Sequence, residues 1–448
     1  MLGILAAVLI LLYGGKSAGG TGGVFENDIR RFKKVCYVTN WSLTRAEARF
    51  SITDIAPSLC THFIYAFANI DVESLSLVPS LKVDVTEGDV TGNYEKLNDL
   101  KKDHPEMRTL LSVGGALAGT SGFDAVSETL FSRKKFSINV VKFLRRWKFD
   151  GLDVDWEFPN LETKSKFTLL IQELRVTFDR HKEKNKPPLL LSAAVGVSET
   201  QITQSYEVHL IADLLDFINV MSYDFHGSWD NTKITGLNSP LFSRSARDTK
   251  FDNTLSVMIS KVTFQDWALN RWIAAGAQPE KLLLGVAAEG RTFTLADKTR
   301  TDIGSPFVSA GEAGAYTKTE GALAYFEICE LVYKGVTRRW DGVQQGPYLY
   351  RDSLWVGYDS PRSVGIKSSY VMRKGLGGVM LWALDLDDFS GNFCKKGRYP
   401  LLTTVNKVLD GKTIVTIDWP SGAERVLPHS THILGLSVIF VFKMTRFN

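Results

Sequence analysis

Eight short apolar runs, rich in β-branched and aromatic residues, recur along the chain with helix-like stretches between them. Most of these runs are almost continuously apolar, as expected for parallel strands that are covered on both faces. Residues 133–148, between the third and fourth runs, repeat their apolar side chains with the spacing of an amphipathic helix. The runs span residues 34–41, 62–70, 109–115, 151–157, 189–196, 217–224, 281–290 and 378–384.

Eight strands that alternate with helices in a chain of 448 residues predict an α/β fold, the (β/α)8 or TIM barrel. The connection from the seventh run to the eighth is too long for one helix, and residues from about 291 to 365 contain short β-like pieces. We therefore expect a small α+β subdomain inserted between strands 7 and 8. Active sites of such barrels lie at the carboxyl ends of the strands, where the sequence places Glu157, Asp224 and Trp382.

The two ends of the chain differ in character from the predicted barrel, which we place at residues 24–402. Residues 1–13 are apolar and residues 14–23 are small or polar, which fits a secretory signal better than a membrane span; an uncleaved anchor is the alternative. In the tail, residues 403–448, small residues at 421–423 precede a spacer and an apolar segment at 433–442, as in a lipid-anchor signal. A terminal strand or a disordered end is the other interpretation. We expect a secreted, extracellular protein, attached to a membrane only if the tail is an anchor.

Charge and cysteine content exclude several classes of function. The chain has 53 basic and 49 acidic residues, and the resulting net charge of +4 is too small to indicate nucleic-acid binding. An even number of cysteines in a secreted chain predicts two disulfides, but four cysteines allow three connectivities. The spacing of cysteine and histidine shows no zinc pattern. We expect a monomer with no metal and no cofactor. The cysteines are Cys36, Cys60, Cys329 and Cys394.

The most informative segment is a strand-like run, residues 149–158, in which three acids alternate with apolar residues. Side chains in a strand repeat every two residues, so Asp153, Asp155 and Glu157 share one face at intervals of about 6.6 Å. Asp150 has the opposite parity, and we interpret it as structural. Carboxylates at this spacing repel one another and are costly to desolvate. They suit chemistry in which one acid stays protonated beside an ionised neighbour, as in the cleavage of a glycosidic bond.

Three other interpretations of this run are weaker. A solvated strand edge does not explain the apolar residues on the opposite face. A calcium loop requires glycine at its sixth position, where this chain has Phe158. A two-metal hydrolase would need more histidines or acids nearby, and the chain has seven histidines in all.

With these features in place, residues from about 34 to 402 resemble the family 18 glycoside hydrolases, in particular the animal chitinases of the chitotriosidase and acidic chitinase type. The segment Asp150-Gly151-Leu152-Asp153-Val154-Asp155-Trp156-Glu157 matches the DxxDxDxE signature of that family. Four further blocks match in the same order, at residues 36–41, 112–115, 221–229 and 381–385.

The resemblance implies a secreted chitinase that hydrolyses β-1,4-linked N-acetylglucosamine polymers or oligomers by substrate-assisted, retaining catalysis, an exception to the two-carboxylate rule. Glu157 would protonate the glycosidic oxygen and later act as a base, while the substrate's own 2-acetamido oxygen attacks the anomeric carbon. Asp155 would bind the acetamido N–H and share a proton with Asp153. Tyr223 and Asp224 would orient and hold the same acetamido group.

The resemblance also implies sugar contacts and disulfide pairs. Trp382, Trp41 and Trp229 would contact sugar rings, with ordinary core packing as the alternative for each. Cys36 would pair with Cys60, and Cys329 with Cys394. The full set of substrate-binding residues that it implies is Trp41, Gly115, Ala116, Met221, Trp229, Glu289, Arg291 and Trp382.

The chain departs from the pattern of its relatives at two cleft positions. Ala116 stands where relatives usually have tryptophan, and the loss of one ring costs about 1 kcal/mol of stacking. Glu289 stands where relatives usually have tyrosine, which puts a fourth acid near the cleft and within reach of Arg291. No cysteine follows Cys394, so we expect no cysteine-rich chitin-binding module.

Two alternative functions stay open at this point. The first is a chitinase-like lectin, which binds chitooligosaccharides without efficient turnover. Glu157 favours the enzyme, since lectin members of the family usually lack the acid, whereas Ala116 and Glu289 keep the lectin under consideration. The second is a hydrolase that acts on other N-acetylglucosamine glycans. The expected partner in the main interpretation is chitin or its oligosaccharides.

Overall fold

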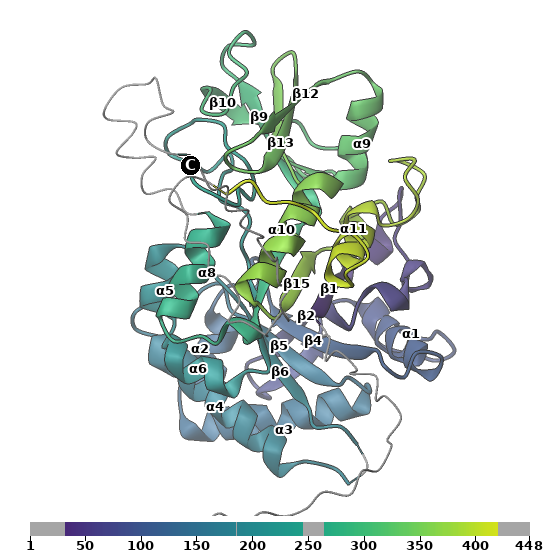
Figure 1. Ribbon diagram of the computed structural model, residues 1–448. Coiled ribbons are helices and arrows are strands. Elements are labelled where there is room, and N and C mark those ends of the chain that lie inside the picture. Colours follow the sequence, from purple (N-terminus) through teal and green to yellow (C-terminus); the bar gives the residue numbers. More distant parts are fainter. Residues whose placement is uncertain (1–31, 185, 245–263, 420–448) are drawn as a thin grey trace, which may run out of the picture. The chain divides into compact units, whose positions relative to one another are not determined.

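The computed structural model describes residues 32–184, 186–244 and 264–419. Eight parallel strands form a closed barrel in the order β1-β2-β4-β5-β6-β7-β8-β15, and β15 pairs with β1 to complete it (Figure 1). This confirms the predicted (β/α)8 barrel and all eight of its strands. The expected signal at 1–23 and the small-residue triplet and apolar segment of the tail lie outside the described residues. The strands are Lys33–Thr39 (β1), His62–Asp71 (β2), Arg108–Gly114 (β4), Gly151–Asp155 (β5), Leu190–Val195 (β6), Phe217–Val220 (β7), Leu282–Ala287 (β8) and Gly378–Trp382 (β15).

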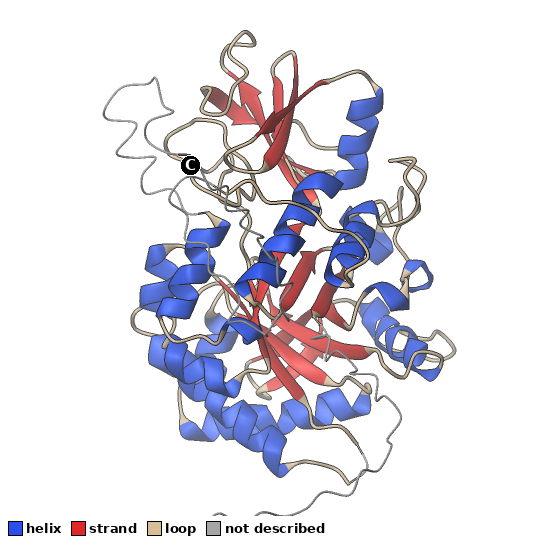
Figure 2. Cartoon of the chain, viewed as in Figure 1, coloured by secondary structure: helices blue, strands red, loops and turns tan. Residues whose placement is uncertain are grey.

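Helices cover the outside of the barrel (Figure 2). The predicted amphipathic helix is α3, whose N-cap residue Thr129 accepts a hydrogen bond from the backbone N–H of Ser132 at 3.0 Å. Its buried face includes Phe136, Val140 and Leu144. The helices around the barrel are Asn93–Asp99 (α1), Ser121–Ser127 (α2), Leu130–Arg146 (α3), Lys164–Arg180 (α4), Glu199–Ser205 (α5), Val208–Leu214 (α6), Gln265–Ala274 (α8), Pro361–Lys374 (α10) and Pro400–Leu409 (α11).

A second, antiparallel sheet is inserted between β8 and β15, as the sequence predicts. Its order is β10-β9-β14-β13-β12, β11 pairs with β9, and helix α9 follows β11. The sheet begins at Glu289, only two residues after β8, and its last strand ends at Gly357, whereas the sequence suggested about 291–365. Its elements are Glu289–Leu295 (β9), Phe307–Ala310 (β10), Ala322–Ala324 (β11), Tyr325–Tyr333 (α9), Thr337–Asp341 (β12), Gly346–Arg351 (β13) and Leu354–Gly357 (β14); the short hairpin strand Ser76–Pro79 (β3) pairs with β2.

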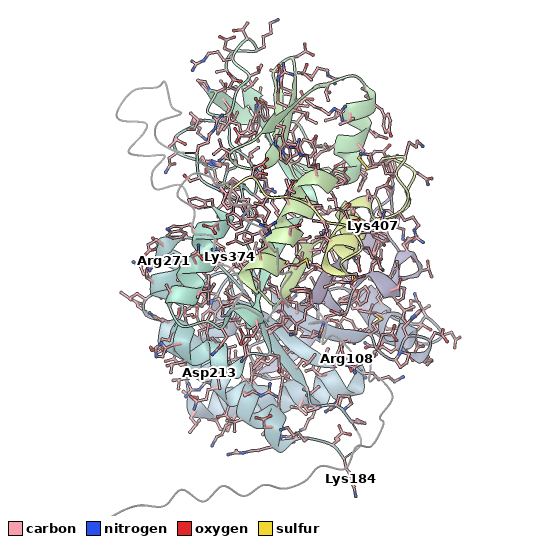
Figure 3. The ribbon with its side chains drawn as sticks, viewed as in Figure 1. Arg108, Lys184, Asp213, Arg271, Lys374 and Lys407 are labelled. Atoms are coloured by element: carbon pink, nitrogen blue, oxygen red, sulfur yellow. A yellow bond between two sulfur atoms is a disulfide. The ribbon has the colours of Figure 1, made fainter. Side chains whose placement is uncertain are left out.

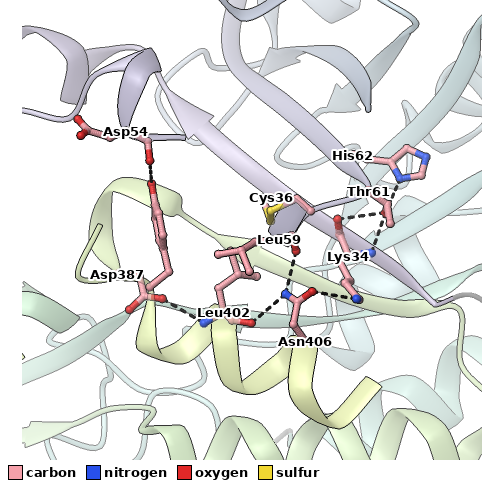
Figure 4. The surroundings of a disulfide bond; sticks show 11 residues. Lys34, Cys36, Asp54, Leu59, Thr61, His62, Asp387, Leu402 and Asn406 are labelled. Carbon is pink, nitrogen blue, oxygen red and sulfur yellow. Dashed lines mark hydrogen bonds between the residues drawn. A yellow bond between two sulfur atoms is a disulfide. The ribbon is translucent and has the colours of Figure 1, made fainter. Parts of the chain in front are cut away.

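Helix α11 extends the fold past residue 402, where the sequence analysis ends the barrel. The reason is apolar burial, because Val405 and Leu409 are covered by the core. The side-chain amide of Asn406 donates a hydrogen bond of 2.8 Å to the carbonyl oxygen of Leu59 and accepts one of 2.8 Å from Lys34 Nζ (Figure 4). These contacts join α11 to β1 and to the segment before β2.

Two disulfides are present, and they pair Cys36 with Cys60 and Cys329 with Cys394, as the family resemblance implies. The first joins β1 to the segment before β2 (Figure 4), and the second joins α9 to the segment before α11. Each bridge therefore connects parts of the fold that are distant in sequence, 24 residues apart in the first case and 65 in the second.

Charged side chains lie over the outer helices, where Figure 3 labels several of them. Arg271 of α8 pairs with Glu199 of α5 at 2.5 Å, and Lys407 on α11 is exposed. Within the described ranges, no helix has the length and apolar character needed to cross a membrane.

Candidate active site

A cavity of about 820 Å³ opens at the carboxyl ends of the barrel strands. The barrel supplies most of its lining, and β9 of the inserted subdomain supplies one wall. Every residue that the sequence analysis assigns to catalysis or sugar binding lines this cavity except Asp153. The lining residues from that set are Trp41, Gly115, Ala116, Asp155, Glu157, Met221, Tyr223, Asp224, Trp229, Glu289, Arg291 and Trp382.

Asp153 lies inside the barrel below the cavity and is fully buried. The strand register places Ser112 of β4 and Ser192 of β6 directly beside it, and their hydroxyls donate hydrogen bonds of 2.8 and 2.6 Å to its carboxylate. The phenol of Tyr37 donates a third at 2.8 Å, and the amide of Asn219 a fourth at 3.1 Å. Four donors therefore fix this carboxylate as an acceptor.

Burial raises the pKa of Asp153, although its hydrogen bonds to Ser192, Ser112 and Tyr37 act in the opposite direction. Each oxygen of Asp153 accepts two of these hydrogen bonds, and the proton that the family resemblance would have it share with Asp155 stays a prediction.

Asp155 is the last residue of β5 and is only 3% exposed. Burial raises its pKa well above the ordinary value, and the neighbouring charges of Glu157 and Asp153 raise it further. Its Oδ1 has no hydrogen-bond partner among the residues that the structure describes. A buried acceptor that lines a cavity and lacks a donor is suited to bind an N–H or O–H group of an occupant.

Glu157 follows the end of β5, so it is not in the strand itself as the sequence pattern suggested. Its side chain still faces the cavity, while Trp156 faces the core and stacks on Phe123 with ring centroids 4.9 Å apart. Burial and the charge of Asp224 raise the pKa of Glu157 to about 7. A carboxyl group with this pKa can hold a proton at neutral pH and give it to a leaving oxygen.

Two acids and one base lie together in the lining of the cavity. Arg291 Nε and Nη2 donate hydrogen bonds of 2.7 Å to the two carboxylate oxygens of Asp224, and Nη2 lies 3.3 Å from Glu289 Oε1. Burial raises the pKa of Glu289 to about 7, although Arg291 opposes that shift. The Arg291 guanidinium also lies over the Trp229 ring, 5.1 Å from its centroid.

Aromatic rings form the floor of the cavity. The rings of Trp41, Phe67 and Trp382 form a cluster with centroids 6.0 to 6.1 Å apart, and the Tyr37 ring lies 5.3 Å from Trp382. Trp41 and Trp229 are 45% and 54% exposed, so neither is an ordinary core residue. The sequence analysis missed Phe67 and Tyr37, and the available signal was their position in strand runs that end at the same face as Trp41.

Glycines at the strand ends permit this close packing. A Cβ at Gly115 would lie 2.5 Å from the Phe67 ring, and the φ of +87° at Gly115 is unfavourable for other residues. A Cβ at Gly285 would lie 2.9 Å from the ring of Tyr223. The Tyr223 hydroxyl is held 3.9 Å from Met380 Sδ at the base of the cavity. Ala116 and Leu117, which follow Gly115, are exposed at the rim.

The arrangement suits proton transfer and sugar binding. It combines Glu157, whose pKa is about 7, with the buried Asp155 Oδ1, which lacks a hydrogen-bond donor, and with a cluster of aromatic rings. Across the described part of the chain, no group of three histidine, cysteine, aspartate or glutamate residues is placed to hold a metal ion.

Comparisons with known proteins identify the family to which the chain is similar. Residues 33–387 match the model of the glycosyl hydrolases family 18. The chain is 40% identical to mouse chitotriosidase-1 over 403 residues, which are 88% of this chain and 81% of the relative. It is 39% identical to human chitinase-3-like protein 2 over 406 residues, 90% of this chain and 95% of the relative.

The similar solved structures include a pseudo-chitinase and a chitinase. Human YKL-39, described as a pseudo-chitinase with retained chitooligosaccharide binding, matches with a TM-score of 0.77 and 38% identity, over 85% of this chain and 100% of the other. The Group IV chitinase of Ostrinia furnacalis in complex with allosamidin matches with a TM-score of 0.78 and 34% identity, over 86% and 100%.

Proposed function

The chain belongs to the glycosyl hydrolases of family 18, and on this basis we propose that it is a chitinase that hydrolyses β-1,4-linked N-acetylglucosamine polymers or oligomers with retention of configuration. The observation that carries the proposal is the carboxyl group of Glu157, which lines the cavity and has its pKa raised to about 7 by burial and by Asp224. A protein that only binds sugar has no need of such a proton donor.

In the proposed reaction, Glu157 gives its proton to the glycosidic oxygen as the bond from that oxygen to the anomeric carbon breaks. The acetamido oxygen of the same sugar forms a new bond to the anomeric carbon and gives an oxazolinium ion. Asp155 accepts a hydrogen bond from the acetamido N–H through its unpartnered Oδ1 and stabilises the positive charge. Water then attacks the anomeric carbon and returns a proton to Glu157.

The remaining residues hold this geometry. Asp153 and its four donors fix the strand end below Asp155. Tyr223 and Asp224, which also line the cavity, orient the acetamido group. The rings of Trp382, Trp41 and Trp229 contact the sugar faces, and Gly115, Ala116, Met221, Glu289 and Arg291 complete the lining.

The second candidate is a chitooligosaccharide-binding protein without efficient turnover. Two observations favour it: Ala116 and Glu289 replace residues that relatives usually have at the cleft, and human YKL-39 of similar fold is described as a pseudo-chitinase. The proton donor Glu157 argues against it.

Hydrolysis of a fluorogenic chitobioside by the purified protein, measured beside Glu157→Gln, separates the two candidates. Release of the fluorophore by the wild type, with loss in the variant, establishes the enzyme. Binding of chitooligosaccharide by both proteins with no release by either establishes the lectin. Binding by neither overturns both.

We also propose that the protein is secreted, and two disulfides fit the oxidising compartments in which they persist. Expression of the full chain in animal cells tests this, since the protein should appear in the medium with its first residues removed. Retention of the whole chain inside the cell would contradict it.

A further inference from the structure

The lining of the cavity has an excess of acid. Among the described residues, four carboxylates line the cavity, those of Asp155, Glu157, Asp224 and Glu289, and Arg291 is the one basic residue of that lining. Asp155 and Glu157 have roles in the proposed reaction, and Asp224 is held by Arg291. Glu289 has no role in that chemistry, so its presence in a buried wall calls for a different explanation.

Arg291 neutralises the negative charge of Asp224 more completely than that of Glu289. Its guanidinium makes two hydrogen bonds of 2.7 Å to Asp224 but approaches Glu289 through a single contact of 3.3 Å. None of the described side chains makes a hydrogen bond to the Glu289 carboxylate. Two acids and one base leave one negative charge without a partner when all three are ionised, and this charge faces the cavity.

Hydrogen bonds to neighbouring segments hold the backbone of Glu289, and Arg291 contacts its carboxylate. Glu289 is the first residue of β9 and pairs with Ala324 of β11, and its carbonyl oxygen accepts a hydrogen bond of 3.2 Å from Asn238. Its side chain is 14% exposed. A mostly buried carboxylate with spare hydrogen-bonding capacity is suited to recognise a cation or a strong donor.

We propose that Glu289 makes the cavity prefer partly deacetylated chitooligosaccharides, by binding the ammonium group of a glucosamine unit. The inference rests on the proposed function, because the reacting sugar must keep the acetamido group that acts as nucleophile. The glucosamine unit therefore occupies the neighbouring position, on the side of Trp229 and Arg291. An ammonium group donates charge-assisted hydrogen bonds, which are stronger than those of the hydroxyls of a neutral sugar.

The charged groups that face Glu289 act in two directions. Arg291 favours its ionised form, whereas Asp224 and Asp385 disfavour it, and burial raises its pKa to about 7. An ammonium group beside the carboxylate adds a second positive charge and favours ionisation further. The preference for the amino sugar is thus strongest near neutral pH, where both partners carry charge.

Affinity measurements in a Glu157→Gln background test the proposal, because that background prevents turnover. The probes are fully acetylated chitopentaose and the chitopentaose isomers with one interior glucosamine, at neutral pH and low salt. We expect one isomer to bind about tenfold more tightly than the acetylated pentamer, the scale of a hydrogen bond to a charged group. The added substitution Glu289→Gln should remove this difference, so that the isomer and the acetylated pentamer bind with equal affinity.

Glu312→Gln is the matched control, since Glu312 is an exposed acid of the same subdomain that lines a separate cavity. It should leave the preference intact. Equal affinity for all pentamers in the parent, or a preference that survives Glu289→Gln, overturns the inference and leaves the proposed function standing. Failure to bind any pentamer overturns both, and binding of deacetylated isomers alone supports the inference while contradicting the proposed substrate.

Discussion

Arg291 holds Asp224 with a paired contact, from Nε to Oδ1 and from Nη2 to Oδ2, each of 2.7 Å. Arg291 belongs to β9 of the inserted subdomain and Asp224 follows β7 of the barrel, so the contact joins the two parts of the cavity wall. It also fixes the carboxylate whose charge raises the pKa of Glu157. The insertion therefore influences the candidate proton donor without touching it.

Replacement of Asp224 by asparagine should move the pH dependence of turnover. An acid catalyst works only while protonated, so activity is lost as pH rises through the pKa of Glu157, about 7. Without the negative charge of Asp224 that pKa falls, and the alkaline limb of kcat/KM should move to lower pH by about one unit. A pH series on the chitobioside measures the shift; an alkaline limb that stays in place would separate Asp224 from the proton donor.

Glu157→Gln should abolish turnover and preserve binding. Glutamine has nearly the same shape as glutamate but cannot donate the proton, and general acid catalysis is worth roughly 10²–10⁴-fold. We expect kcat to fall by at least that factor, with the dissociation constant for a chitooligosaccharide changed by less than about threefold. Wild-type turnover in this variant would remove Glu157 from the mechanism.

Much of this site could be predicted from the sequence because its signals are local. The alternation of acids and apolar residues at 153–157 predicts that the three acids share one face, and near-continuous apolar runs indicate each buried strand. The strand boundary was less predictable: β5 ends at Asp155, and Glu157 lies in the loop beyond it. Strand periodicity continues in the sequence past the last ladder hydrogen bond, so the pattern alone does not show where the strand stops.

The sequence analysis missed contacts between residues that become neighbours only when the barrel closes. β1 pairs with both β2 and β15, which brings Phe67 and Trp382 to the same floor although they are far apart in the chain. Within an apolar run, Phe67 is indistinguishable from a core residue. The donors around Asp153 depend likewise on register, because Ser112 and Ser192 become its neighbours only when β4 and β6 align with β5.

Glu289→Gln should stabilise the fold at high pH but not at low pH. Burial raises the pKa of Glu289 from 4.5 to about 7, so the folded state binds its proton more tightly than the unfolded state does. Stability from this group is therefore fully present below about pH 4.5 and is lost as pH rises through about 7. The variant should gain up to about 3 kcal/mol over the wild type at alkaline pH. Urea denaturation of both proteins across this range gives the difference, and a difference independent of pH would contradict the assignment.

Removal of the second disulfide should weaken the attachment of the insertion. Cys329–Cys394 closes a loop between residues separated by 65 positions, and loss of a disulfide typically costs about 2–4 kcal/mol. The double variant Cys329→Ser/Cys394→Ser should lose about this much in chemical denaturation. Peptide mapping of the wild type without reduction should recover the two observed pairs; a crossed pairing would be inconsistent with the fold.

Ala116→Trp should increase affinity for long oligomers and leave short ones nearly unchanged. Ala116 is an exposed residue of the cavity lining, after Gly115, and the same lining includes the stacked rings of Trp41 and Phe67. A chain of sugars that extends past the rim finds no aromatic face there, so the wild type should gain little from added units and act poorly on crystalline chitin. A new ring at this position should supply about 1 kcal/mol of stacking, a fivefold gain in affinity, but only for oligomers long enough to reach it.

Binding titrations across a series from dimer to hexamer measure the effect, with Glu312→Gln as an unrelated surface control. A gain of equal size at every length would place residue 116 next to the reacting sugar, and no gain at any length would show that its side chain points away from the bound chain.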